Sequence, residues 1–274
     1  MKRERLTFLA VCLLATGVAT ASDKISLLPG ANMSRADIYI TPAPRRSVGT
    51  LILCPGHNGN GEEMIRDDAW TAFAQKENLD LAGLSFASDD NSQDEGYFKA
   101  ESGSGALLLE GLKRAFGPTP RPLLLYGFSR GAQFVDSFVR WKPAGVAAWC
   151  AYSATEWENP ETSAQEPRGI IACGDEDEPN YSSAVFQFLR GRSMDKPWTW
   201  VSLAHTGHCR SVALESLARA YFAALLHNPT ANGLWLDVDT KNTLAPEELR
   251  EHPTLAAWLP DRSVAGAWKN LHQP

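Results

Sequence analysis

The most regular feature of the chain is a series of apolar runs separated by polar, helix-compatible stretches. A short early strand is expected at 37–40, and the apolar runs cover 49–54, 79–86, 123–126, 145–150, 169–173 and 198–203. The stretches with helical spacing cover 70–76, 105–116, 134–139, 182–189 and 212–226. Strands that are apolar throughout are buried on both faces, and their alternation with helices favours a parallel sheet. The pattern therefore predicts a three-layer α/β fold, with a mostly parallel central sheet and helices on both of its faces.

The segment after 227 differs, because it carries Trp235, Trp258 and Trp268 with no clear further strand. We interpret 227–274 as an extension that packs over the same domain. Its tryptophans then anchor it to the core rather than contact a ligand. With 44% hydrophobic and 21% charged residues and no repeat or linker, 22–274 is predicted to form one domain, with its core at about 35–226.

The first 21 residues have the pattern of an export signal. Three basic residues precede the apolar run from Leu6 to Leu14, and Ala19-Thr20-Ala21 offers a cleavage site. A membrane anchor is disfavoured because the run is shorter than the ~20 residues that span a bilayer. Lipid attachment at Cys12 is disfavoured by the bulky valine before it. We expect a periplasmic or secreted protein without stable membrane insertion.

The charge and the cysteines narrow the picture further. The formal net charge of −6 disfavours nucleic acids and anionic membranes as partners. Export allows disulfides among Cys54, Cys150, Cys173 and Cys209, and all three full pairings stay open. A bridge between Cys173 and Cys209 would clamp the two loops that carry the candidate acid and base.

A candidate nucleophile follows the apolar run at 123–126. The run leads into Gly127-Phe128-Ser129-Arg130-Gly131 and then into a helix. A strand that reverses into a helix within a few residues holds the residue at the apex in a strained backbone conformation. Gly127 and Gly131 leave room where strand and helix approach each other. This arrangement predicts that Ser129 is presented for nucleophilic attack.

A serine hydroxyl needs a base within hydrogen-bond reach and a third group that orients the base. The run at 169–173 ends in Gly174-Asp175-Glu176-Asp177, and the run at 198–203 ends in Ala204-His205-Thr206-Gly207-His208. Because the carboxyl ends of parallel strands meet at one edge of a sheet, these groups are expected to converge on Ser129. Their order along the chain, Ser, Asp, His, is that of the α/β-hydrolases.

On these motifs, most of 35–226 resembles the α/β-hydrolase superfamily. The compact form without a large cap is similar to dienelactone hydrolases and to acetyl and feruloyl esterases. In those relatives a glycine, two residues and an aspartate supply the acid, and a glycine-histidine pair supplies the base. The resemblance implies Asp177 and His208 for these roles.

Other residues stay open beside this assignment. Asp175 is the alternative acid in its crowded loop, and Glu156 and Glu158 are outside candidates. His205 is interpreted as a surface residue. A zinc site formed by His205, His208 and the acidic loop is disfavoured, since no third ligand has recognisable spacing.

An acyl transfer also needs donors for the developing oxyanion. The backbone N–H of Arg130 is expected to supply one, and that of His57 or Asn58 in the loop 55–61 the second. A phosphate cradle is disfavoured for this glycine-rich loop, because it lacks the lysine and Ser/Thr of nucleotide loops. Tyr152 and Trp157 are the aromatic residues of the connection 151–168 and are candidates for substrate contact. The short connection predicts an open site.

The acidic loop Asp89, Asp90, Asp94 and Glu95 is interpreted as a solvated surface loop rather than a calcium site. No metal or cofactor is expected. The leading hypothesis is an exported serine hydrolase that cleaves a carboxylic ester through an acyl-enzyme at Ser129. A serine peptidase of the same superfamily and a catalytically silent binding protein are the alternatives. The substrate is expected to be a small or polysaccharide-linked ester, and the oligomeric state is open.

Overall fold

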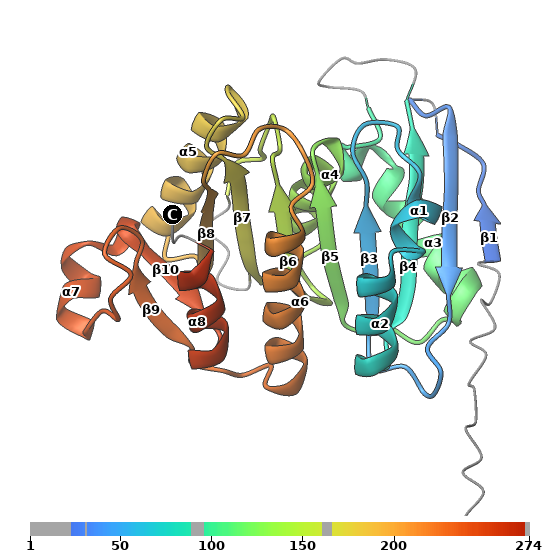
Figure 1. The fold of residues 1–274 in the computed structure, drawn as a ribbon. Helices are drawn as coiled ribbons and strands as arrows, with labels where there is room; N and C mark the ends of the chain where they lie inside the picture. Colours follow the sequence, from blue (N-terminus) through green and yellow to red (C-terminus); the bar gives the residue numbers. More distant parts are fainter. Residues whose placement is uncertain (1–22, 31, 89–95, 161–165, 272–274) are drawn as a thin grey trace, which may run out of the picture.

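A computed structural model of the chain describes residues 23–30, 32–88, 96–160 and 166–271. Within these residues, eight strands form one sheet in the order β1-β2-β4-β3-β5-β6-β7-β8 (Figure 1). Their bounds are β1 (Asp23–Ser26), β2 (Arg35–Thr41), β3 (Thr50–Cys54), β4 (Asp80–Ala87), β5 (Leu123–Phe128), β6 (Val146–Tyr152), β7 (Arg168–Gly174) and β8 (Trp198–Leu203). β2 pairs antiparallel with β1 and β4, and the strands from β4 to β8 pair in parallel. The predicted three-layer α/β fold is confirmed.

Helices cover both faces of this sheet. Their bounds are α1 (Gly61–Ile65), α2 (Asp68–Glu77), α3 (Ser104–Phe116), α4 (Arg130–Trp141), α5 (Asn180–Ser193), α6 (Val212–His227), α7 (Pro246–Glu251) and α8 (Arg262–Asn270), with short 3₁₀ turns at Ala100–Ser102 and Pro253–Leu255. α3, α4 and α5 bury their apolar residues against one face, and α1, α2, α6 and α8 bury theirs against the other. Alternate residues of each strand serve the two cores: Leu125 of β5 lies in one and Leu124 in the other.

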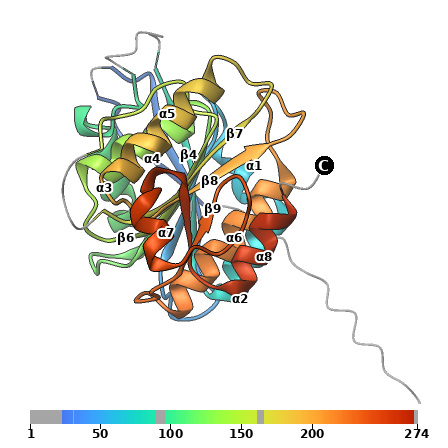
Figure 2. The same cartoon turned by 90° about the vertical axis from the view of Figure 1, so that its left-hand side faces the viewer.

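The segment after α6 contains strands that the sequence did not reveal. β9 (Leu234–Asp237) and β10 (Ala256–Leu259) form an antiparallel pair beside β8 (Figure 2). The expectation of no further strand is wrong, because two segments of only four residues each pair with each other across α7, a contact between distant parts of the chain. The expected anchoring role is confirmed for Trp258 and Trp268, which are buried in the core. Trp268 Nε1 also donates to the carbonyl of Trp200 in β8, at 2.7 Å.

The four cysteines of the described residues are all free. Cys54, Cys150 and Cys173 are buried and Cys209 is exposed, so the bridge considered between Cys173 and Cys209 is not formed. The predicted signal at 1–21 lies outside the described residues. No helix in the described part of the chain is long and apolar enough to cross a membrane.

Candidate active site

Ser129 lies at the apex of the turn between β5 and α4. Its backbone has φ +56° and ψ −124°, so the strained conformation expected for this position is confirmed. The N–H of Ser129 donates to the carbonyl of Tyr152 at 2.9 Å, which ties the apex to the end of β6. The turn therefore holds the serine rigidly above the carboxyl end of the sheet.

The two glycines of the turn leave no space for a side chain. A Cβ at Gly131 would lie 2.1 Å from the carbonyl oxygen of Cys54, and one at Gly127 would lie 2.3 Å from the carbonyl oxygen of Gly131. Both distances are far inside van der Waals contact, and the neighbouring atoms belong to the backbone. The sequence-based reason for these glycines, the close approach of strand and helix, is confirmed.

His208 reaches Ser129 from the loop after β8. Its Nε2 lies 2.9 Å from Ser129 Oγ, a hydrogen-bond distance. The ring packs at 5.0 Å from the ring of Phe128, and its side chain is 40% exposed. The hydroxyl of Tyr152 donates to the carbonyl of Cys209, the residue that follows His208, at 2.7 Å. The loop that carries His208 is thus held by contacts with Phe128 and Tyr152, while part of the imidazole ring stays exposed to solvent.

Asp177 completes the hydrogen-bonded series from the turn after β7. Its Oδ2 lies 2.8 Å from His208 Nδ1, and the residue is only 4% exposed. Asp175 is exposed and accepts instead from the backbone N–H of Thr206, at 3.4 Å. Of the two aspartates that the sequence left open, the structure places Asp177 against the histidine.

The other acidic candidates are engaged elsewhere. Glu156 Oε2 accepts from Gln133 Nε2 at 3.0 Å, and Glu158 Oε1 pairs with Lys99 Nζ at 2.6 Å. His205 is 90% exposed at its side chain, with Nδ1 3.5 Å from a carboxylate oxygen of Glu176. The interpretation of His205 as a surface residue therefore agrees with its position.

Two residues that sequence reasoning missed hold the carboxylate of Asp177. Asn180, at the start of α5, donates from Nδ2 to Asp177 Oδ1 at 2.9 Å, and the same nitrogen lies 3.2 Å from His208 Nδ1. Ser153, at the end of β6 with φ +56°, also hydrogen-bonds Asp177. The sequence signal that could have indicated them is a polar side chain directly after a strand, for Ser153, and one at the start of the following helix, for Asn180.

These contacts determine the ionisation of Asp177. Burial raises the pKa of this carboxyl, but the hydrogen bonds from His208, Ser153 and Asn180 outweigh burial, and the net pKa lies below its usual value. The thiol of Cys173 lies 3.7 Å from Oδ2, and burial raises the pKa of that thiol to about 12. Near neutral pH the site therefore contains an ionised Asp177 beside a neutral thiol.

Solved structures with the same architecture identify the fold. The chain is similar to an S-formylglutathione hydrolase from Staphylococcus aureus, with a TM-score of 0.55 and 12% identity over 73% of this chain and 96% of that one. A poly(3-hydroxybutyrate) depolymerase from Bordetella parapertussis matches with a TM-score of 0.54 and 16% identity over 84% and 94%. The esterase PE8 matches with a TM-score of 0.53 and 17% identity over 67% and 96%. This chain has the α/β-hydrolase fold.

Sequence comparisons add nothing to this identification, since neither the protein-family models nor the curated protein sequences give a match. At the identities of the structural matches, the likeness establishes the fold alone.

The loop 55–61 borders Ser129 on the side of β3. A Cβ added at Gly56 would lie 3.5 Å from Ser129 Cβ, so the backbone there passes close to the serine. The side chain of Asn58 holds Ser88 through two hydrogen bonds of 3.0 Å, and Arg35 Nη2 donates to the carbonyl of Asn58 at 2.7 Å. On the other side, the N–H of Arg130 lies in the first turn of α4, where backbone donors have no intrahelical partner.

The two aromatic candidates for substrate contact occupy different positions. Tyr152 is fully buried and uses its hydroxyl on the histidine loop. Neither its ring nor its hydroxyl is open to solvent in this structure, and substrate contact by Tyr152 stays a prediction. Trp157 is half-buried and packs against the core on the side of α4.

No group of three or more His, Cys, Asp or Glu side chains in the described ranges is arranged to hold a metal ion. The acidic loop with Asp89, Asp90, Asp94 and Glu95 lies outside those ranges.

Proposed function

We propose that the protein is a serine hydrolase of carboxylic esters, with Ser129 as nucleophile, His208 as base and Asp177 as the group that orients it. One observation carries the proposal: a continuous series of hydrogen bonds joins Ser129 Oγ to His208 and His208 to Asp177, at 2.9 and 2.8 Å, on a strained turn. A serine outside such a setting would be a poor nucleophile at neutral pH.

The first half of the reaction forms an acyl-enzyme. Ser129 Oγ attacks the carbonyl carbon of the ester while His208 Nε2 takes the hydroxyl proton. The oxyanion of the tetrahedral intermediate accepts hydrogen bonds from the N–H of Arg130 and from that of His57 or Asn58, an interaction worth about 2.7–4 kcal/mol per donor. The intermediate collapses when the C–O bond to the alcohol breaks, and His208 returns the proton to the departing alkoxide.

The second half uses water in place of the serine. His208 takes a proton from a water molecule, the hydroxide attacks the acyl carbon, and the ester bond to Ser129 breaks with the proton returned to Oγ. Asp177 stays ionised throughout, fixes the Nδ1–H tautomer and stabilises the imidazolium. Since a protonated His208 cannot accept the serine proton, activity is expected to fall under acidic conditions.

Two further observations favour an ester over a peptide bond. Proteins with this fold are named as an esterase, an S-formylglutathione hydrolase and a poly(3-hydroxybutyrate) depolymerase. The described part of the connection between β6 and β7 also has no helix that could gate a peptide substrate. We extend the proposal to export, on the basic and apolar pattern of 1–21.

The deciding experiment is covalent labelling with a fluorophosphonate, together with turnover of p-nitrophenyl esters of increasing acyl length. Wild-type protein should be labelled and active, and Ser129→Ala should lose both the label and at least about 10⁴-fold in kcat. Ser182→Ala, which changes a surface serine of α5, is the matched control and should behave as wild type. Full activity in Ser129→Ala would refute the mechanism, and an unlabelled, inactive wild type would favour the silent binding protein.

A further inference from the structure

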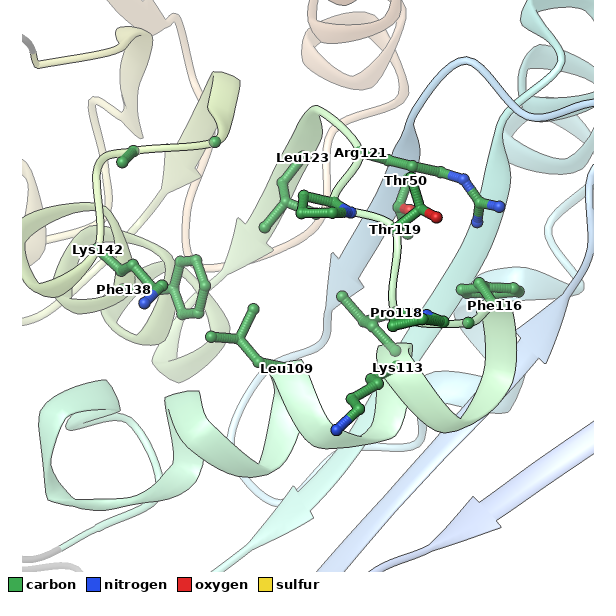
Figure 3. Close-up of a pocket in the computed structure, with 15 residues that line it drawn as sticks. Thr50, Leu109, Lys113, Phe116, Pro118, Thr119, Arg121, Leu123, Phe138 and Lys142 are labelled. Carbon is green, nitrogen blue, oxygen red and sulfur yellow. The ribbon is translucent and has the colours of Figure 1, made fainter.

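A second concave site lies at the amino ends of the strands, whereas Ser129 lies at their carboxyl ends. It is a pocket of about 300 Å³ between the end of α3, the loop 117–121 and the start of β5, with the end of α4 on its other side (Figure 3). The length of β5 separates it from Ser129, which corresponds to roughly 20 Å of extended chain. A ligand here would therefore not touch the proposed catalytic residues.

The wall of this pocket is apolar. α3 contributes Leu109, Leu112 and Phe116, while Leu123 begins β5 and Phe138 comes from α4. Leu109 and Phe116 are only partly buried, whereas Leu112, Leu123 and Phe138 belong to the closed core behind them. The volume lies at the lower end of that usual for small-molecule sites, which are mostly apolar with a few polar groups that fix orientation.

The charged groups around the opening are all cations. Lys113, Arg121 and Lys142 line the pocket, and no aspartate or glutamate does, although the chain has a net charge of −6. Arg121 is paired with Asp80 at 2.6 Å. Lys113 and Lys142 are exposed and form no ion pair within the described residues; Figure 3 shows them on different elements, α3 and the segment after α4.

We propose that this pocket binds an aliphatic carboxylate of medium chain length. The chain would lie along the partly buried side chains of Leu109 and Phe116, where it is removed from water. The carboxylate would remain at the opening, within the field of Lys113 and Lys142. Charge selects the anion over a neutral amphiphile, and the small volume selects a single short chain over a lipid with two chains. This proposal does not depend on the proposed function.

The test is isothermal titration calorimetry of the full wild-type chain with hexanoate, octanoate and decanoate below their micelle-forming concentrations. We expect one molecule bound per chain, with affinity increasing about fourfold for each added methylene until the pocket is filled. Decanol should bind more weakly than decanoate, because it lacks the charge.

Two variants locate the site. Lys113→Ala/Lys142→Ala should weaken decanoate about fivefold and leave decanol unchanged, as expected for two solvent-exposed ion pairs. The matched control Lys24→Ala/Lys76→Ala removes the same charge elsewhere and should bind decanoate as wild type does. Leu109→Glu places a carboxylate in the wall and should reduce binding more than tenfold, with its fold checked by circular dichroism.

The proposal is overturned if decanoate does not bind, or if neither variant changes its binding. It is also overturned if sedimentation shows a wild-type dimer that Leu109→Glu converts to a monomer, since a second copy of the chain would then occupy the pocket.

Discussion

Two buried aspartates show how differently this fold uses the amino ends and the carboxyl ends of its strands. Asp80 begins β4 and Asp177 follows β7, and each residue is 4% exposed. Asp80 accepts from the N–H of Ala43 at 3.0 Å and from Arg121 at 2.6 Å. Asp177 accepts from Asn180 and contacts His208 at 2.8 Å.

Both carboxylates satisfy the general requirement that a buried charge be paired and hydrogen-bonded. The partners of Asp80 are a backbone N–H and a guanidinium that line no proposed reaction site, so that aspartate only joins segments of the scaffold. The main partner of Asp177 is an imidazole, which in turn contacts the Ser129 hydroxyl at 2.9 Å. The two aspartates are therefore equally buried, but Asp80 has a structural role at the amino ends of the strands and Asp177 a proposed chemical role at their carboxyl ends.

The largest expected effect is that of Asp177→Asn on turnover. An amide at this position cannot hold the Nδ1–H tautomer of His208, so kcat should fall about 10⁴-fold. The free energy of unfolding should change by no more than about 2 kcal/mol, because one charge-assisted hydrogen bond is lost. Steady-state kinetics and urea unfolding measure the two effects. Asp175→Asn is the control and should stay within about twofold of wild type, as an exposed substitution does; the opposite ranking of the two variants would identify Asp175 as the acid.

Asp80→Asn is expected to give the reverse pattern. The substitution leaves Arg121 without its carboxylate and should lower the free energy of unfolding by about 2 kcal/mol. The folded fraction should keep kcat/KM within about twofold of wild type, since the changed atom is far from Ser129. Asp239→Asn, at an exposed aspartate, is the stability control. A large loss of kcat in Asp80→Asn without unfolding would show that the two edges are not separable.

Asn180→Ala should have an intermediate effect, confined to the carboxyl edge. The loss of a hydrogen bond to a charged group predicts about a tenfold lower kcat with KM unchanged. Without that donor, the Asp177 carboxylate is held by fewer hydrogen bonds and orients His208 less well. Asn180→Ser, which keeps a donor, should recover part of the loss, and Ser182→Ala on the same helix should have no effect. A kcat that Asn180→Ser does not recover at all, with the fold intact by circular dichroism, would show that the donor of Asn180 does not position Asp177.

Most of the strands that the sequence predicted are continuous apolar runs; the exception, 37–40, begins with Asp37 and lies in β2, where partly buried and buried residues alternate. The run 198–203 coincides with β8 and 49–54 differs from β3 by one residue, since both strands are buried on both faces. β9 and β10 have four residues each, and all but one residue of β9 is only partly buried. The pairing of β9 with β10, which are separated along the chain by α7, is a tertiary contact that a four-residue run does not encode.

The candidate site divides in the same way. Ser129 and the loops of Asp177 and His208 could be predicted, because each follows an apolar strand and the ends of parallel strands meet. The choice of Asp177 over Asp175 depends on how one turn directs two side chains, and the contact of Asn180 depends on where α5 begins. Both are settled by tertiary packing, and no spacing along the chain encodes them.

The smallest expected effect is a pH dependence of stability at the carboxyl edge. Hydrogen bonds from His208, Ser153 and Asn180 hold the pKa of Asp177 below its usual value, despite burial. A lowered folded-state pKa means that the carboxylate stabilises the fold above its unfolded pKa of about 3.9, and that this contribution is lost as the pH falls through the lower folded value.

The difference in free energy of unfolding between wild type and Asp177→Asn should therefore move against wild type as the pH drops from about 4 towards 2. Urea unfolding at each pH measures it. A difference that moves in favour of wild type in acid would mean that burial dominates and that Asp177 prefers its protonated form. In that case the carboxylate could not stabilise an imidazolium, and the contrast with the permanently paired Asp80 would lose its physical basis.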